Sequence, residues 1–373
     1  MRPDWDHLDD LPARGARSRP RSKQRPAHVG ALTAMIIGVD RGRYLARLDG
    51  REVVAVKARE LGHRGVVVGD IASLVGDTSG RRDTLARIVR VAPRRTELTR
   101  ATEEGRGRER VIVANANQMV VVAALAEPPP RIGMIDRQLV AAYDGGLETV
   151  LCLTKADLET SWATRSSPVE ALAAAPSTAE TRQSWTSAEL KALYEPLGVR
   201  VVETGRLASH RDNGSSGSKG PLGGLDEFRE LLAGQISVLV GHSGVGKSTL
   251  INALVPGAGR ATGAVNLVTG KGRHTSSSAL ALELPEGGWV IDTPGVRSFG
   301  LSHVKAERVL AAFPDLAEIS DDCPRGCTHG PDLQECALQE WASSSPQRRM
   351  RLDSYRRIAA SLEAHPTGRR GNN

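Results

Sequence analysis

Aromatic side chains, long apolar runs and cysteines are all scarce in this chain of 373 residues. Phe, Trp and Tyr make up only 3% of it, which argues against single-stranded nucleic-acid binding by base stacking. No stretch approaches the ~18 consecutive apolar residues of a membrane span, and the first residues lack the apolar segment of a secretory signal. We therefore expect a cytoplasmic protein with no membrane partner.

Three of the four cysteines lie close together, between residues 323 and 336. This crowding favours a reducing compartment and a metal site over a disulfide framework. Three thiolates and one imidazole would complete a tetrahedral zinc site with no open position, so we expect one structural Zn²⁺. The predicted ligands are Cys323, Cys327, His329 and Cys336.

Positive charge is in excess, with a net charge of +7 and a pI of about 9.5. Such a balance favours a polyanionic partner, either nucleic acid or the ribosome. Residues 1–30 hold a run of basic residues from Arg14 to Arg25 without an acid, and we expect a disordered basic arm there. Docking on phosphate and simple solvation both explain that arm. Residues 366–373 are expected to be a tail.

Residues 31–100 are expected to form a small barrel that resembles an OB-fold. Asp49-Gly50 separates two of the β-rich runs and predicts a hairpin turn. From Arg81 to Arg110 there are ten arginines against five acids, which predicts an edge that faces phosphate. The five predicted strands are 33–37, 44–48, 52–56, 70–75 and 84–89.

The stretch from Gly241 to Thr249 fits the phosphate-binding pattern G-x-x-x-x-G-K-[ST]. A predicted strand at 236–240 precedes it and a predicted helix at 248–254 follows, as a P-loop requires. Lys247 would reach the β- and γ-phosphates, and the Ser248 hydroxyl would bind Mg²⁺. The predicted nucleotide ligands of this loop are Gly241, His242, Ser243, Gly244, Val245, Gly246, Lys247, Ser248 and Thr249.

Thr154-Lys155-Ala156-Asp157 follows a predicted strand and matches the guanine-binding signature N/T-K-x-D. The carboxylate of Asp157 would accept hydrogen bonds from guanine N1 and N2, and the stem of Lys155 would lie on the base. Thr154 replaces the commoner Asn, which leaves open what supports the motif. Thr204 stands where GTPases place a backbone loop over guanine O6, although its neighbours depart from the usual S-A pair.

Two further segments predict a magnesium site and γ-phosphate sensors. Thr275 lies in the polar loop 271–275 and is expected to bind Mg²⁺ when γ-phosphate is present. Asp292 begins the sequence D-T-P-G and would hold Mg²⁺ through water, while the Gly295 N–H would sense the γ-phosphate.

The order of these motifs is unusual, because the guanine signature precedes the P-loop and D-T-P-G comes last. We infer a circularly permuted GTPase domain over residues 111–300, of alternating strands and helices around a mainly parallel sheet. Its first strands are predicted at 111–115, 118–124 and 149–153, and 159–187 is expected to be a flexible insertion.

After this permutation the D-T-P-G segment runs directly into a zinc-binding helical domain, predicted over residues 301–365. A γ-phosphate signal could therefore act on that domain. Residues 338–364 are predicted to form one helix with an RNA-facing group of arginines. That group is Arg348, Arg349, Arg351, Arg356 and Arg357.

From about residue 31 to 365 the pattern resembles the family of small-ribosomal-subunit-dependent GTPase A, the RsgA/YjeQ type. Weaker matches are Arg94-Arg95, Ala114-Asn115 and Ile135-Asp136-Arg137. The resemblance implies a late assembly factor that binds the small (30S) subunit and its 16S rRNA near the decoding region, and leaves on GTP hydrolysis. The chain is expected to be a monomer that uses GTP/GDP, Mg²⁺ and Zn²⁺.

Val296 follows D-T-P-G where many GTPases carry a Gln that orients the attacking water. We therefore expect slow intrinsic hydrolysis and stimulation by the ribosome, which would order the switch segments. Besides Lys247 and Thr275, His274 is the first internal candidate for a catalytic group, and His242 is the second.

Three alternatives remain at this point. The first is a permuted GTPase that acts on the large subunit or another RNA. The second is a nucleic-acid-binding module with a non-hydrolysing nucleotide site, against which the intact Lys247, Ser248, Thr275 and Asp292 argue. The third is a metabolic P-loop kinase, against which Asp157 argues.

Overall fold

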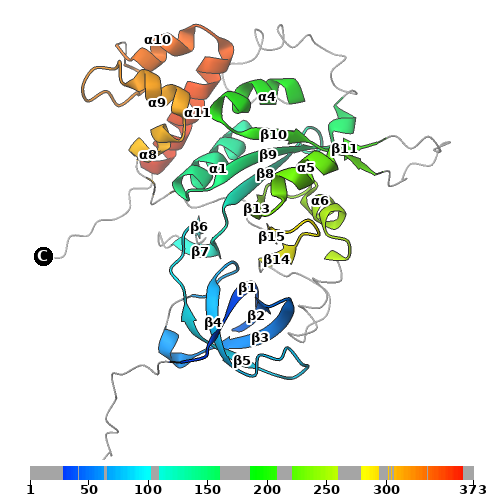
Figure 1. The fold of residues 1–373 in the computed structure, drawn as a ribbon. Coiled ribbons are helices and arrows are strands. Elements are labelled where there is room, and N and C mark those ends of the chain that lie inside the picture. The colour runs from blue at the N-terminus through cyan, green and yellow to red at the C-terminus, as the bar shows by residue number, and fades with distance from the viewer. Residues whose placement is uncertain are drawn as a thin grey trace, which may run out of the picture.

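The structure is a computed structural model in which a barrel, a central sheet and a helical module can be distinguished (Figure 1). Among the residues it describes, no helix has both the length and the apolar character needed to cross a bilayer. The described residues are 28–40, 42–62, 65–101, 109–159, 185–207, 221–258, 279–293, 301, 304, 306–333 and 335–363.

The first five strands form a closed barrel in the order β1-β2-β3-β5-β4, because β4 pairs back onto β1. Alternate residues point inward, so that Ile36, Leu74 and Ile88 are fully buried in its core. Asp49 and Gly50 both have positive φ, as a tight hairpin turn requires. The predicted OB-fold-like barrel is confirmed. Its strands are β1 (Leu32–Asp40), β2 (Arg43–Leu48), β3 (Arg51–Lys57), β4 (Ile71–Gly76) and β5 (Ala86–Val91).

A separate two-stranded ribbon lies between the barrel and the central sheet (Figure 1). It pairs β6 (Glu97–Ala101) with β7 (Glu109–Ala114) in antiparallel fashion. The prediction that 111–115 belongs to the parallel sheet is wrong, because Asn115 has a φ of 56° and turns the chain before the next strand. The Ala114 N–H instead bonds to Val68 O of the barrel, at 2.9 Å.

The central sheet has the order β10-β9-β8-β13-β15-β14, with all neighbours parallel except β14 and β15. Because the strands are parallel, their carboxyl ends meet at one edge, where ligands bind in such sheets. The strands are β8 (Gln118–Ala124), β9 (Glu148–Thr154), β10 (Arg200–Glu203), β13 (Ile236–Val240), β14 (Leu280–Glu283) and β15 (Trp289–Asp292).

Helices cover both faces of this sheet, so every residue of β8 is buried. Met119 and Val121 belong to the hydrophobic cluster under α1 (Ile132–Asp144) and α4 (Ser187–Tyr194). Val120 and Val122 belong to the cluster on the other face, under two further helices. Those are α5 (Leu225–Leu232) and α6 (Lys247–Leu254), and a small pairing joins β11 (Gly205–Arg206) to β12 (Leu222–Gly223).

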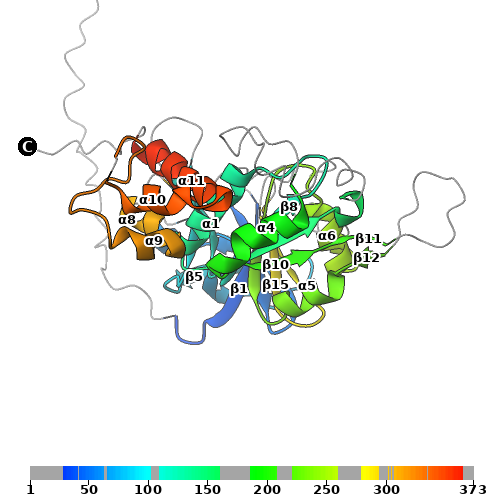
Figure 2. The same cartoon turned by 90° about the horizontal axis from the view of Figure 1, so that it is seen from above.

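The C-terminal module is helical and packs beside α1, as the view from above shows (Figure 2). Phe313 and Tyr355 belong to the same hydrophobic cluster as the α1 side of the sheet. The predicted single helix over 338–364 is in fact two. The break arises because the Ser345 hydroxyl accepts the Arg348 N–H, and Pro346 suits a helix start. The helices are α8 (Ala306–Ala311), α9 (Pro314–Ser320), α10 (Ala337–Ser343) and α11 (Pro346–Glu363).

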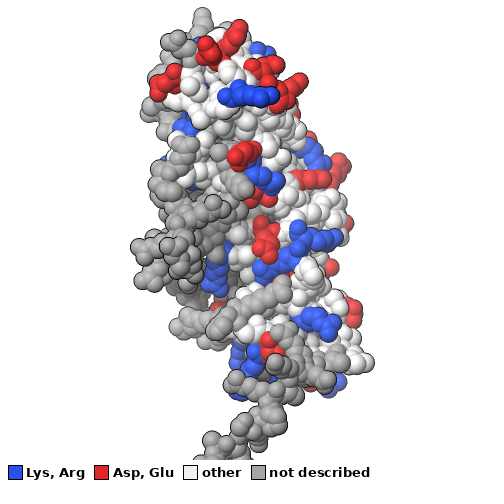
Figure 3. Space-filling view, turned by 90° about the vertical axis from the view of Figure 1, so that its left-hand side faces the viewer, with Lys and Arg blue, Asp and Glu red and all other residues white. Residues whose placement is uncertain are grey.

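The barrel also touches the central sheet directly, because Gly38 of β1 pairs with Leu280 of β14. Arg47 and Glu283 form an ion pair of 2.5 Å beside this contact. On the face drawn in Figure 3, acidic and basic side chains are interspersed, and no surface of a single sign dominates the described residues there.

Candidate functional site

The phosphate-binding loop joins β13 to α6 at the carboxyl edge of the sheet. Gly241, Gly244 and Gly246 have φ values of 149°, 85° and 99°, which side chains rarely adopt. A Cβ on Gly241 would also lie 2.3 Å from Val122 O. The glycines therefore allow a loop conformation that brings the backbone against β8.

Lys247 is the first residue of α6, and its side chain bends back into the loop. Its Nζ donates to Gly241 O at 2.5 Å and to His242 O at 3.1 Å. Burial lowers the pKa of Lys247, and the nearby Asp292 opposes that shift. An ammonium held this way can bind the anionic phosphates of a nucleotide.

The guanine signature begins at the last residue of β9 and continues in a short 3-10 turn over Ala156–Leu158. Asp157 is exposed, and its Oδ1 accepts the backbone N–H of Arg206 at 2.9 Å. Lys155 has a φ of 57°, and its Nζ donates to the carbonyl oxygen of Glu127. Sequence reasoning missed Glu127, because a backbone carbonyl leaves no signature in the sequence.

The contacts of Thr154 show what supports the guanine signature when Thr replaces the commoner Asn. Its buried hydroxyl donates to Val245 O of the phosphate loop at 2.5 Å. A Cβ on Gly246 would lie 3.5 Å from the same hydroxyl oxygen. Thr154 therefore joins the guanine signature directly to the phosphate loop.

The side chain of Thr204 points away from the nucleotide site. It is buried, and its hydroxyl lies 3.9 Å from Cys152 Sγ and 3.5 Å from Leu153 O. The residue next to Asp157 is Gly205, where a Cβ would lie 2.8 Å from the Asp157 backbone nitrogen. Only the backbone after Thr204 can thus approach a base, and a side chain at Gly205 would displace Asp157.

Asp292 ends β15 and pairs in register with Leu239 of the strand that leads into the phosphate loop. Burial raises the pKa of Asp292, and Lys247 opposes the shift. Asp292 and the exposed Ser248 offer the oxygen ligands that Mg²⁺ prefers. The other predicted residues, His274, Thr275 and Gly295, lie outside the described residues.

The four predicted zinc ligands come together near the C-terminus, with all ligand atoms within 4.8 Å of one another. Cys323 Sγ lies 3.6 Å from His329 Nδ1 and 3.9 Å from Cys336 Sγ, and Cys336 Sγ lies 3.8 Å from His329 Nδ1. A tetrahedron of Zn–S bonds has edges of about 3.8 Å. The donor set and spacing therefore fit zinc.

The five arginines of the predicted RNA-facing group do not share one exposed surface. Arg351 is buried, with Asp136 and Asp315 as ion-pair partners. Arg356 donates to the carbonyl oxygens of His329 and Gly330, next to the metal ligands. Exposed positions are occupied by Arg348 and Arg349. Periodicity alone could not separate these roles, because they depend on what α11 packs against.

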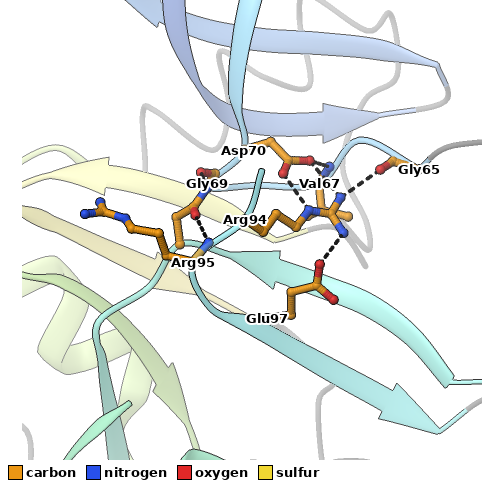
Figure 4. Close-up of polar contacts among 8 residues, drawn as sticks. Gly65, Val67, Gly69, Asp70, Arg94, Arg95 and Glu97 are labelled. Carbon is orange, nitrogen blue, oxygen red and sulfur yellow. Dashed lines mark hydrogen bonds and ion pairs between the residues drawn. The ribbon is translucent and has the colours of Figure 1, made fainter. Parts of the chain in front are cut away.

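Two of the weaker family matches form a polar joint between barrel and linker (Figure 4). Arg94 binds both carboxylate oxygens of the buried Asp70, at 2.7 and 2.9 Å, and also Gly65 O at 2.8 Å. Asn115 accepts the Arg95 N–H and donates to Gly69 O, both at 2.9 Å. These side chains are structural, since they hold barrel loop and linker together.

A family model described as RsgA GTPase matches residues 91–204 and 216–302 of the chain. The small ribosomal subunit biogenesis GTPase RsgA of Ectopseudomonas mendocina is 36% identical over 276 residues, covering 74% of this chain and 70% of that protein. The protein of the same description from Pseudomonas aeruginosa gives the same identity and coverage.

Two solved structures share the fold. YjeQ from Thermotoga maritima has a TM-score of 0.61 and 23% identity, covering 90% of this chain and 99% of that one. YloQ, described as a circularly permuted GTPase, has a TM-score of 0.60 and 20% identity, covering 91% of this chain and 98% of that one. The fold inferred from the order of the motifs is therefore confirmed.

Proposed function

This chain belongs to the RsgA GTPase family, and on that premise we propose that it hydrolyses GTP to GDP and phosphate on the small ribosomal subunit. It acts late in the assembly of that subunit, in the cytoplasm, as a monomer that contacts 16S rRNA. The observation that supports this most directly is the bond from Thr154 to Val245 O, which joins a guanine signature to a phosphate loop.

In this mechanism each motif holds one part of the nucleotide. The carboxylate of Asp157 accepts the N1 and N2 hydrogens of guanine, and the Lys155 stem covers the base. Lys247 turns from the loop carbonyls to the β- and γ-phosphates, which the loop N–H groups also bind. Ser248 and Thr275 would hold Mg²⁺, and Asp292 would hold it through water; the ion would supply positive charge that offsets the charge developing on the phosphates.

Hydrolysis is slow in the free protein, because Val296 cannot orient a water molecule. Docking on the small subunit orders the segments around Thr275 and Gly295 and brings a polar group to the water. His274 is the first candidate for that group, and His242 is the second. The Cys/His cluster holds a structural zinc ion that folds the C-terminal module, since all four ligand positions come from the chain.

We propose that the chain divides into three units, which carry the barrel, the nucleotide site and the Cys/His cluster. Residues 31–100 form the barrel unit, 111–300 the GTPase unit and 301–365 the zinc unit. An arm precedes them at 1–30 and a tail follows at 366–373. The insertion expected at 159–187 interrupts the second unit, but it ends before Thr186, which caps α4, and Trp185, which is buried.

The decisive experiment is phosphate release from GTP with small subunits, with large subunits, and without either. We expect strong stimulation by small subunits only.

Asp157→Ala should abolish GTP binding, because the guanine N1 and N2 hydrogens lose their acceptor. Asp226→Ala removes an exposed carboxylate from α5 and serves as the matched control. Equal stimulation by large subunits, or displacement of GTP by ATP, would refute the proposal.

His274 has its own test. His274→Ala is expected to lower turnover on the small subunit while leaving GTP affinity unchanged. Full turnover in this variant would exclude the histidine as the group that orients water.

A further inference from the structure

Asp136 is a buried carboxylate on α1 that the nucleotide site does not use. Its side chain is fully buried, and Tyr194 of α4 donates to its Oδ1 at 2.9 Å. From the C-terminal module, the Ser354 hydroxyl donates to its Oδ2, and Arg351 Nη1 lies 3.6 Å from Oδ1. Arg351 is itself 5% exposed and lies over the Phe313 ring at 4.4 Å.

Such a cluster resists separation of the two modules. Removing Arg351 from Asp136 would leave a buried carboxylate without its cation, and removing Ser354 would leave it one hydrogen bond short, both of which are unfavourable in a buried site. The hydrophobic cluster that α1 shares with α11 surrounds this contact. Asp136 therefore makes α11 and α1 move as one body.

The same helix α11 also holds the metal-binding segment. Two residues beyond Ser354, Arg356 donates to His329 O at 2.8 Å and to Gly330 O at 2.9 Å. Tyr355 places its ring 6.2 Å from the His329 ring. These contacts tie α11 to the Cys/His segment, which a zinc ion bound by its four ligands would order.

The segment just before α1, at the end of the helix nearer to Asp136, contacts both parts of the nucleotide site. The Leu125 N–H bonds to Thr154 O at 2.9 Å, and Glu127 O accepts the Nζ of Lys155. A Cβ on Gly244 of the phosphate loop would lie 3.7 Å from Pro128 Cδ. A displacement of α1 would therefore disturb the base-binding and phosphate-binding elements together.

From these contacts we propose that Asp136 is a joint through which zinc loading of the Cys/His cluster and nucleotide binding strengthen each other. The proposal rests on the proposed function, since it takes guanine nucleotide and zinc as the ligands. Linkage requires that the effect be reciprocal: zinc raises the affinity for GDP, and GDP raises the affinity for zinc by the same factor.

The test measures GDP affinity by calorimetry, with the full chain loaded with zinc and after zinc is removed by a chelator. In the natural protein we expect zinc removal to weaken GDP binding about fivefold or more, the lower end of typical coupling between sites. In the double variant Asp136→Asn/Arg351→Met both charges of the joint are removed together, and the other partner of Arg351, Asp315, is 29% exposed to solvent. Zinc removal should then change GDP affinity less than about twofold. Ser354→Ala, which keeps the ion pair, should give an intermediate factor.

Arg308→Ala is the matched control, because Arg308 also links the C-terminal module to α1, through an ion pair with Asp144 of 3.0 Å, but is 51% exposed. It should keep the full zinc dependence. Hydrogen exchange checks that zinc removal exposes amides of α1 while β8 and β13 stay protected, which excludes global unfolding.

Three outcomes separate the two proposals. Equal GDP affinity with and without zinc in the natural protein would refute the joint and leave the nucleotide site standing. An undiminished zinc effect in the double variant would also refute it. Failure of the zinc-loaded natural protein to bind GDP at all would instead refute the proposed function.

Discussion

At the scale of single residues, the ammonium of Lys247 lies inside the phosphate loop, with the carbonyl oxygens of Gly241 and His242 as acceptors. Burial lowers its pKa, which means that the folded, ligand-free protein disfavours the charged form. We predict that Lys247→Met leaves the melting temperature of the ligand-free protein unchanged or higher. GTP affinity should fall about tenfold or more, because charge-assisted hydrogen bonds to phosphate are lost.

Thermal unfolding without nucleotide and calorimetric titration with GTP test this prediction together. A lower melting temperature of the ligand-free variant would show that Lys247 supports the loop even without a ligand. Lys191→Met, in an ion pair of 2.5 Å with Glu203 away from the phosphate loop, controls for the loss of a lysine.

Asp292 predicts a dependence of stability on pH. Burial raises the pKa of Asp292 in the folded protein. At pH values between the pKa of the unfolded state and that of the folded state, the folded state therefore binds more protons than the unfolded state. Stability from this group therefore falls as the pH rises from the unfolded value of about 3.9 through the folded one. Asp292→Asn removes this effect, and its stability relative to the natural protein should be higher near pH 7 than near pH 4.

Urea unfolding of both proteins at the two pH values gives this difference directly. The opposite sign would mean that Lys247 and other partners outweigh burial. Glu148→Gln, at an exposed carboxylate at the start of β9, controls for the loss of one acidic charge.

Sequence reasoning found the residue types of the nucleotide site but not their orientations. It proposed Thr154 without a partner, and the partner, Val245 O, lies 91 residues further along the chain. It proposed Thr204 from its place after a strand, whereas Gly205 is the residue that approaches Asp157. Contacts of this kind depend on three-dimensional distances, which a motif does not encode.

At the scale of elements, Gly69 shows how closely the barrel approaches the linker. It has a φ of 89°, and a Cβ there would lie 1.8 Å from Ala114 O at the end of β7. We predict that Gly69→Ala destabilises the protein by more than the ~1 kcal/mol expected for positive φ alone, because β7 must also move. Gly62→Ala is the matched control, since Gly62 has a φ of 55° and open space around its Cβ position.

Chemical denaturation of the two variants separates backbone strain from collision. Equal losses of stability would mean that the barrel and β7 can move apart without cost. A larger loss for Gly69→Ala would establish that their close approach is fixed.

Most elements were predictable, and the exceptions share a cause. Strong local patterns predicted the five barrel strands and the strand at 236–240, because alternation and turn residues are encoded within short segments. The strand predicted at 111–115 was expected in the central parallel sheet, but β7 pairs with β6 instead. This pairing depends on the turn at Asn115 and on contacts with the barrel, which are distant in the sequence. The single helix predicted over 338–364 conflicts with a local signal, because Ser345-Pro346 favours a helix start.

At the scale of the whole molecule, the contacts between modules could not be predicted at all. Arg94 and Asp70 are 24 residues apart, and Ser354 reaches Asp136 across 218 residues. The first pair joins the barrel to the linker that follows it, and the second joins the central sheet's α1 to the C-terminal module. Arg94-Arg95, Asn115 and Asp136 belong to the weaker matches to the family. In the structure Arg94 and Asn115 contact the barrel loop, and Asp136 contacts the C-terminal module.

The ion pair of Arg94 with Asp70 gives the last prediction. The side chain of Asp70 is fully buried and that of Arg94 is 9% exposed, and the carboxylate also accepts the Val67 N–H at 2.8 Å. Arg94→Met would leave a buried carboxylate without its cation, so we predict a loss of about 3–5 kcal/mol in unfolding free energy. The double variant Asp70→Asn/Arg94→Met removes both charges and should recover part of that loss.

Urea unfolding of the single and double variants measures this coupling. If the pair also orients the barrel relative to the linker, the double variant should hydrolyse GTP at the natural basal rate and lose part of the proposed stimulation by small subunits. If stimulation is unchanged while the free energy falls as predicted, the pair stabilises the barrel without orienting it. Equal losses in the single and double variants would mean that the loss does not arise from an unpaired buried charge, and the argument would then fail.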